Sequence, residues 1–383
     1  MKQLIKFFFN AFGVHLKAEP KTFVMVTTFI PQSELPCPKG VAVDTNGNVI
    51  FSYDFYRVCK VTSYGKPIMN IGEPLYVSLS GEEIRNDFKN PRSVSADEIG
   101  NIYVADTGNN RICKITSDGN VTTLAGSGIS DYADGRGTDA CFREPEGVAL
   151  DTSGNIYVAD TGNHRIRKIT PDGNVTTLAG SGKIDCKDGP GKFACFYSPK
   201  GVAVSASGNI YVADTSNNRI RMITTSGNVS TLAGSGIFGY LDGRCREARF
   251  SFPSGVAVDV SGNVYVADTG SNRIRKITAN GLSYITANSH VTTIAGSNKG
   301  LHLRSGYFDG IGTEASFNEP HAVAVHTCGD LYVTDSGNNR IRKVTNYYTS
   351  EVAVDASGNV FVADTYKNQM RLISPGSTSN KMI

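Results

Sequence analysis

The stretch that decides the fold is Tyr-Val-Ala-Asp-Thr-Gly-Asn-His-Arg-Ile-Arg-Lys-Ile-Thr at residues 157–170. Related stretches recur along the chain, and with their flanks they form seven copies, which begin at Gly40, Ser93, Gly147, Gly201, Gly255, Ala322 and Glu351. The aspartate of this block falls at positions 54, 106, 160, 214, 268, 335 and 364, so the spacings are 52, 54, 54, 54, 67 and 29 residues. A repeat of about 50 residues is typical of a β-propeller or a solenoid.

Each copy divides into four short apolar runs, which in the third copy are residues 147–151, 156–160, 165–170 and 175–180. All four runs are rich in β-branched residues, as strands are. A Ser-Gly-Asn turn joins the first two runs, and Asp-Thr-Gly-Asn joins the second and third, where glycine and asparagine accept positive φ angles. We therefore expect a four-stranded antiparallel blade in each copy, covered on both faces by neighbouring blades of a ring.

The block at residues 157–170 resembles the NHL repeat, with His164 at the position of the family's histidine. The resemblance covers residues 22–374, although asparagine replaces this histidine at positions 110, 218, 272 and 339. It implies an all-β propeller, and such propellers most often have six blades. Because this chain has seven copies, we expect seven repeat units, and the alternative is six full blades plus a partial one.

The two ends of the repeat array suggest how the ring closes. The last copy ends after its third run at Ile373, whereas residues 26–29 resemble a fourth run. This match predicts that an N-terminal strand completes the last blade, which would remove an exposed sheet edge. Only residues 346–350 separate the sixth and seventh copies, so we expect the sixth blade to lack its outer strand, unless the sequence has lost about two dozen residues there.

Composition agrees with a folded, turn-rich β protein: the 383 residues include 41 Gly, 18 Phe and 17 Tyr. We expect a leader at residues 1–21, a propeller at 22–374 and a disordered tail at 375–383. The leader resembles a weak secretory signal, which leaves the compartment open between secretion and the cytoplasm. No run approaches the ~18–20 apolar residues of a membrane helix. The formal charge of +3 indicates no particular partner.

The eight cysteines lack the paired spacing of a zinc site, so no metal and no cofactor is predicted. Cys186 and Cys195 share one link between copies, and their disulfide state stays open.

The repeat aspartate and the arginine five residues later face each other across a turn, and we expect hydrogen-bonded pairs with a structural role. These pairs are Asp106 with Arg111, Asp160 with Arg165, Asp214 with Arg219, Asp268 with Arg273, and Asp335 with Arg340. Runs such as Arg165-Ile-Arg167-Lys168 resemble basic stripes that bind phosphate. Acidic turns interleave with these runs near the expected rim, so RNA binding is the weaker hypothesis.

The residue after each link proline begins the innermost strand, where the channel of a propeller opens. Its identity changes from copy to copy and gives Lys39, Arg92, Glu146, Lys200, Ser254 and His321, with Ser350 in the shortened copy. Three cations, one carboxylate and one histidine predict a channel mouth that attracts anions and binds a small or peptidic ligand.

The sequence outside the repeats contains no nucleophile elbow, Cys/His pair or phosphate-binding loop. Propeller lyases and lactonases hold a metal with ligands from several blades, and here only Glu146 and His321 occupy the ring. We therefore expect a monomeric, non-catalytic scaffold that binds a protein or peptide through the face carrying the links between blades. The alternatives are a metal-dependent propeller hydrolase or lyase with a channel site, and an RNA-binding propeller.

Overall fold

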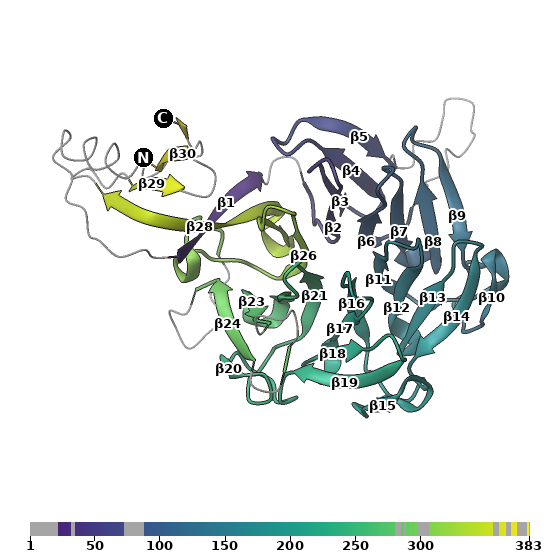
Figure 1. Ribbon diagram of the computed structural model, residues 1–383. Helices are drawn as coiled ribbons and strands as arrows, with labels where there is room; N and C mark the ends of the chain where they lie inside the picture. The colour runs from purple at the N-terminus through teal and green to yellow at the C-terminus, as the bar shows by residue number, and fades with distance from the viewer. Residues whose placement is uncertain are drawn as a thin grey trace.

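The computed structural model describes residues 22–31, 35–72, 88–279, 285–286, 289–297, 306–354, 360–364, 369–373 and 381–382. Antiparallel sheets surround a central axis, and the protein is a six-bladed β-propeller (Figure 1). Over the described part of the chain, helical structure is limited to three-residue 3-10 turns. No helix there has the length and apolar character that crossing a membrane would need. The expected leader at 1–21 lies outside the described residues, as does most of the expected tail.

The first two blades have four strands each. The first consists of β2 (Val41–Val43), β3 (Val49–Tyr53), β4 (Arg57–Val61) and β5 (Pro67–Ile71). The second consists of β6 (Pro91–Ala96), β7 (Ile102–Asp106), β8 (Arg111–Ile115) and β9 (Val121–Ala125).

In the next three blades, a two-residue strand from the preceding link pairs with the outer strand. The third blade consists of β11 (Pro145–Leu150), β12 (Ile156–Asp160), β13 (Arg165–Ile169) and β14 (Asn174–Ala179), with β10 (Gly135–Arg136) at its edge. The fourth consists of β16 (Pro199–Val204), β17 (Ile210–Asp214), β18 (Arg219–Ile223) and β19 (Asn228–Ala233), with β15 (Gly189–Pro190). The fifth consists of β21 (Pro253–Val258), β22 (Val264–Asp268), β23 (Arg273–Ile277) and β24 (His290–Ala295), with β20 (Gly243–Arg244).

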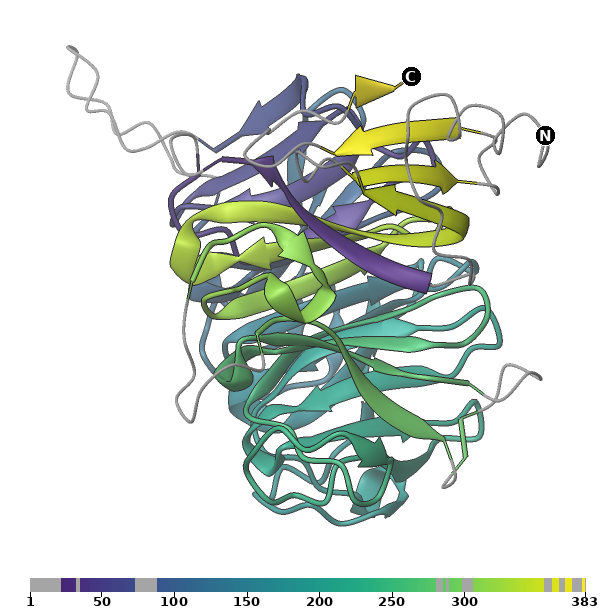
Figure 2. The ribbon, with the colours of Figure 1, turned by 90° about the vertical axis from the view of Figure 1, so that its left-hand side faces the viewer.

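The sixth blade combines both ends of the repeat array. Its strands are β26 (Pro320–Val325), β27 (Leu331–Asp335), β28 (Arg340–Val354), β1 (Thr22–Ile30) and the edge strand β25 (Gly310–Ile311). β1 pairs antiparallel with β28, with Met25 opposite Thr345, and lies beside it in Figure 2. The backbone N–H of Thr28 donates to the Asp309 carboxylate at 2.9 Å, as the equivalent Thr231 does to Asp188 at 3.1 Å in the fourth blade. The expectation that the sixth blade lacks an outer strand is therefore wrong, because β1 occupies that position.

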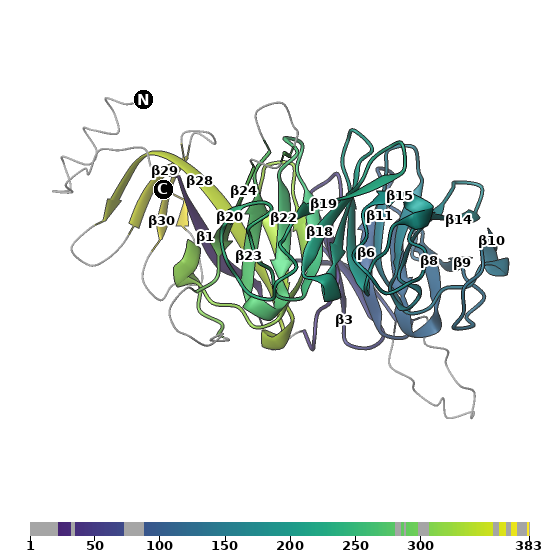
Figure 3. The ribbon, with the colours of Figure 1, turned by 90° about the horizontal axis from the view of Figure 1, so that it is seen from below.

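The seventh copy lies outside the ring. β28 continues from the sixth copy into the seventh and pairs there with β29 (Val360–Asp364), which is followed by β30 (Gln369–Ile373) and β31 (Lys381–Met382). These strands project from one side of the propeller (Figures 1 and 3). One apolar cluster joins Val41 and Phe51 of the first blade to Tyr332 and Ile341 of the sixth, so these two blades are direct neighbours. The ring thus has six blades, as in the alternative prediction, and not seven.

The turns between the second and third strands connect each blade to the next. In the third blade, residues 161–163 form a 3-10 turn, and His164 follows with a left-handed φ of 55°. Its Nδ1 accepts the Ser198 N–H at 3.1 Å, and the Thr161 hydroxyl donates to the Pro199 carbonyl at 2.7 Å. Asparagine side chains accept the same bond at positions 110, 218, 272 and 339. The position therefore requires a residue that tolerates positive φ and offers an acceptor, and asparagine meets both needs.

The core lies between blades. The second strand of each blade, such as β12, is buried along its whole length, because neighbouring sheets cover both of its faces. Clusters of buried side chains accordingly draw on two blades each: Tyr103 of the second blade and Val158 of the third share one with Phe142 of the link between them.

Candidate functional site

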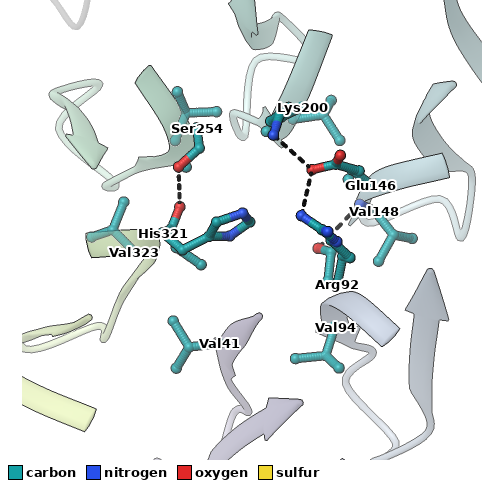
Figure 4. A pocket seen from close by; sticks show the side chains of 16 residues that line it. Val41, Arg92, Val94, Glu146, Val148, Lys200, Ser254, His321 and Val323 are labelled. Carbon is teal, nitrogen blue, oxygen red and sulfur yellow. Dashed lines mark hydrogen bonds and ion pairs between the residues drawn. The ribbon is translucent and has the colours of Figure 1, made fainter. Parts of the chain in front are cut away.

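A cavity opens on the axis of the propeller, where the innermost strands begin (Figure 4). In five blades this strand starts at the link proline, and the residue after the proline lies at the axis. Five blades thereby bring together Arg92, Glu146, Lys200, Ser254 and His321. The cavity has a volume of about 70 Å³, which is room for about five water-sized groups. We call these five residues and the space between them the channel mouth.

Glu146 lies between two cations of the channel mouth. Its Oε2 is 3.6 Å from Arg92 Nη1 and 3.4 Å from Lys200 Nζ, and Figure 4 shows the three groups pointing toward one another. The Glu146 side chain is 10% exposed, and those of Arg92 and Lys200 are 26% and 27% exposed. Both distances exceed the 2.7–3.2 Å range typical of hydrogen bonds, so the charges attract without forming tight pairs.

Three buried polar atoms of the channel mouth have no hydrogen-bond partner: Arg92 Nε, Glu146 Oε2 and His321 Nε2. Burial, followed by the positive charges of Lys39, Lys200 and Arg92, lowers the pKa of His321 well below its usual value. At neutral pH its ring is therefore uncharged. Because buried polar groups in proteins are rarely left unpaired, three in one cavity indicate a place for a ligand or ordered water.

The walls of the cavity are apolar. Each blade contributes one buried valine of its innermost strand, namely Val41, Val94, Val148, Val202, Val256 and Val323. The innermost strands also approach closely, because a side chain at Gly147 would clash with the Lys200 carbonyl. The cavity thus combines a charged rim with a ring of methyl groups.

The structure places five of the six predicted mouth residues around this cavity. Lys39 is not among its lining residues, although its charge acts on His321. The Ser254 hydroxyl is already used, since it donates to the His321 carbonyl at 2.6 Å. Sequence reasoning missed the valine ring, although a valine is the second residue of every copy.

The buried partner of the repeat aspartate is in most blades not the arginine that the sequence suggested. The expected pair forms in the second blade, where Arg111 Nε lies 2.7 Å from Asp106. In the next blade Asp160 is bound at 2.8 Å by Arg167. Arg221, Arg275 and Arg342 take the same position against Asp214, Asp268 and Asp335. Arg111 can replace this second arginine because the second blade has Cys113 there.

Arg165 and its counterparts bind elsewhere. Arg165 donates to the carbonyls of Asn163 and Ser181 and lies 3.8 Å from the centre of the Tyr132 ring. The equivalent residues Arg219 and Arg273 donate to the carbonyls of Ser235 and Ser297, and Arg340 donates to that of Tyr307.

Each buried second arginine holds the link that precedes its blade. Arg167 is fully buried and donates to Asp160, to Asp134 of the link at 2.6 Å, and to the carbonyls of Ala133 and Cys141. Asp188, Asp242 and Asp309 are the equivalent link aspartates. We call this arrangement the arginine node. The link residues are therefore fixed by charge-assisted hydrogen bonds from the blade interior.

The arginine node shows that the basic runs are not exposed stripes. Sequence reasoning placed the second arginine of each run on the solvated rim, but Arg167, Arg275 and Arg342 have no exposed surface. The lysine that follows Arg342 is also engaged, because Lys343 lies 2.9 Å from Asp330. These side chains are not available to bind phosphate groups, which weakens the RNA hypothesis.

Other groupings of charged residues give no comparable site. Over the described ranges, no three or more histidine, cysteine, aspartate or glutamate residues lie close enough to hold a metal ion. A hollow at the opposite end of the channel carries Asp44, Asp97 and Asp151, but these carboxylates already accept bonds from their own turns. Cys186 and Cys195, like the other six cysteines, are free thiols, and all eight lie within the described residues.

The links carry most of the exposed apolar surface. Thirteen of the eighteen exposed large apolar side chains among the described residues lie on the links that precede the third to sixth blades. The link before the fifth blade has the largest group, which we call the 237–252 cluster: Ile237, Phe238, Tyr240, Leu241 and Phe252. Backbone hydrogen bonds join the two arms of this link, from Gly239 to Phe250 at 3.1 Å and from Arg249 to Leu241 at 3.0 Å.

The fold, the repeated turn and the arginine node define a β-propeller built of NHL repeats, and comparison with known families agrees. The NHL repeat model matches residues 88–115, 142–169, 196–221, 250–277 and 317–344. The chain is thus an NHL repeat β-propeller protein.

Its relatives are longer or more distant. It is 30% identical to human NHL repeat-containing protein 2 over 354 residues, which cover 82% of this chain and 47% of that protein. A protein of unknown function from Bacteroides thetaiotaomicron has the same fold, with a TM-score of 0.63 at 19% identity over 85% of this chain and 76% of the other. An auxiliary nutrient binding protein from the same species also has this fold, with a TM-score of 0.61 at 15% identity over 85% of this chain and 77% of the other. The chain spans about half the length of its human relative.

Proposed function

We propose that this protein is a monomeric, non-catalytic scaffold that binds a protein or peptide partner through the face that carries the links. The observation behind the proposal is the concentration of exposed apolar side chains on these links. Contiguous exposed apolar surface on a soluble protein commonly marks an interaction site. The NHL repeats favour the same interpretation, although they name no partner.

The arginine nodes support this proposal because they hold the apolar links in one arrangement. Arg275 fixes the link of the 237–252 cluster through Asp242 at 2.6 Å and through the carbonyls of Leu241 and Arg249, both at 3.0 Å. A loop fixed before binding loses little conformational entropy when a partner docks. The links therefore have the rigidity of a preformed binding surface.

A metal-dependent hydrolase has less support. Of the possible ligands, the channel mouth holds only Glu146 and His321, and the nearby cations Arg92 and Lys200 would repel a divalent ion. RNA binding has less support as well, since the second arginines of the basic runs are buried.

The partner surface can be tested by capture of interacting proteins from the native cell extract. The double variant Phe238→Asp/Phe252→Asp should lose partners that the unmodified protein retains, because each change places a charge in an apolar interface. The matched control is Ile99→Asp/Val260→Asp, whose side chains are 79% and 83% exposed in turns at the opposite face. Equal loss in both variants, or retention in both, would contradict a binding surface on the links.

Phe252 gives a second prediction, on stability. It is 49% exposed and has a left-handed φ of 46°, a conformation that asparagine tolerates better than phenylalanine. We expect Phe252→Asn to leave the free energy of unfolding unchanged or raise it by up to about 1 kcal/mol, while it weakens partner capture. Phe250→Ala, two residues away and fully buried, should instead cost roughly 3–5 kcal/mol. Denaturant titration of both variants measures the difference, and a large loss in Phe252→Asn would show that its ring serves the core.

A further inference from the structure

The channel mouth has an excess of positive charge. Arg92 and Lys200 flank the single carboxylate of Glu146, and Lys39 acts on the same space through its effect on His321. Two cations of the lining therefore face one carboxylate, which leaves one positive charge in excess. A second negative charge would balance this excess at short range, where the low local dielectric strengthens the attraction.

The unpaired atoms show where such a charge would be held. Arg92 Nε is a buried donor without an acceptor, and His321 Nε2 is a second nitrogen without a partner in the same cavity. In Figure 4 the guanidinium of Arg92 and the ring of His321 point into the cavity from opposite sides. An oxyanion beside Arg92 would accept its unused N–H. The neutral ring of His321 hydrogen-bonds to the backbone of Lys39 through its other nitrogen, so His321 Nε2 carries a lone pair and would accept a hydrogen bond from a water molecule.

The apolar wall selects among anions. Six valines, one from each blade, surround the space beside the charged rim, and each is at least 93% buried. Phosphate and sulfate would leave these methyl groups without contact, whereas an alkyl group would cover them. The volume of about 70 Å³ limits such a ligand to a few non-hydrogen atoms.

We propose that the channel mouth binds the carboxylate of a short-chain aliphatic acid or of a peptide chain terminus, with the carboxylate beside Arg92 and the apolar end against the valine ring. The site is independent of the link surface, and either of the two proposals can fail without the other.

The test is isothermal titration calorimetry of the full chain with sodium butyrate, sodium acetate and sodium phosphate. We expect butyrate to bind most tightly, acetate more weakly because it contacts fewer valines, and phosphate least. Arg92→Gln and, separately, Lys200→Gln should each weaken butyrate binding by about tenfold or more, since each removes a charge that attracts the carboxylate. Lys192→Gln, on a link away from the axis, should leave the affinity unchanged.

The Glu146→Gln variant separates an electrostatic role of Glu146 from a purely structural one. If a carboxylate occupies the channel mouth, removal of the resident negative charge should strengthen butyrate binding by about tenfold, because like charges no longer repel. If Glu146 only maintains the shape of the mouth, the same variant should weaken binding. Circular dichroism of every variant confirms that the propeller is folded, and Lys200→Gln keeps the test decisive if Arg92→Gln does not fold.

A pentapeptide that ends in valine, compared with its C-terminal amide, distinguishes the two sources of the carboxylate. Binding of the free acid but not of the amide identifies a chain terminus, whereas binding of butyrate alone identifies a free acid. Absence of heat with both butyrate and the peptide overturns the proposal. Binding of phosphate in preference to butyrate, or an equal loss of affinity in Lys192→Gln, also overturns it.

Discussion

Deletion of residues 1–30 is expected to abolish the cooperative unfolding of the propeller, whereas deletion of residues 346–383 should leave it nearly intact. β1 contributes Val26, which is fully buried, and covers the edge of β28 in the sixth blade. The seventh copy lies outside the ring and supplies no innermost strand. Without β1, the outer edge of β28 is exposed, and the strand pairing that joins the first and last parts of the chain is lost.

Thermal unfolding followed by circular dichroism measures both truncated chains. A substitution pair gives a finer control: Val26→Asp should cost at least about 3 kcal/mol because it buries an unpaired charge. Thr27→Asp, at a half-buried position opposite Lys343, should change stability by less than about 1 kcal/mol. In a seven-bladed ring closed by the N-terminal strand, both deletions would abolish cooperative unfolding, since residues 346–383 would then supply a blade.

Arg221→Ala is expected to lower the free energy of unfolding by roughly 3–5 kcal/mol, the usual cost of breaking a buried ion pair by removing one partner. Its guanidinium is fully buried and binds Asp214 at 2.7 Å and the carbonyls of Lys187 and Cys195 at 3.0 Å. The substitution leaves the buried Asp214 carboxylate without its cation. It also releases the link, so amide hydrogen exchange should rise across residues 181–198.

Arg219→Ala is the matched control, because it removes the same side chain two residues earlier. Arg219 donates to the Ser235 carbonyl at 3.0 Å and is partly exposed, so the expected loss is about 1 kcal/mol, without faster exchange in the link. Denaturant titration and exchange measured by mass spectrometry separate the two variants. A larger loss for Arg219→Ala than for Arg221→Ala would contradict the arginine node.

The position of the mouth residues could be predicted because it depends on local order along the chain. The proline that ends each link fixes where the innermost strand begins, so the following residue reaches the axis in five blades, from Arg92 to His321. Lys39 departs from this rule, since it precedes β2 and is not among the lining residues. The loose contacts of Glu146 could not be predicted, because they depend on the separation of strands from three blades.

The arginine pairs show the limit of reasoning from one turn. Asp160 and Arg165 are opposite each other in the strand register, as the sequence suggested. Asp160 nevertheless forms its ion pair with Arg167, which lies in the interior and also binds Asp134 of the link. Those link contacts come from residues more than 30 positions away, and no local pattern reports them.

The sequence by itself determined the elements: four strands to each copy, the turns that join them, and the residues that follow each link proline. These features depend on side-chain alternation and turn chemistry within a few residues. The tertiary structure decided that six blades close the ring, that β1 joins the sixth blade, and that the second arginine is the buried one. Each of these depends on how well distant sheets fit around one axis, and a count of repeats carries no information about that fit.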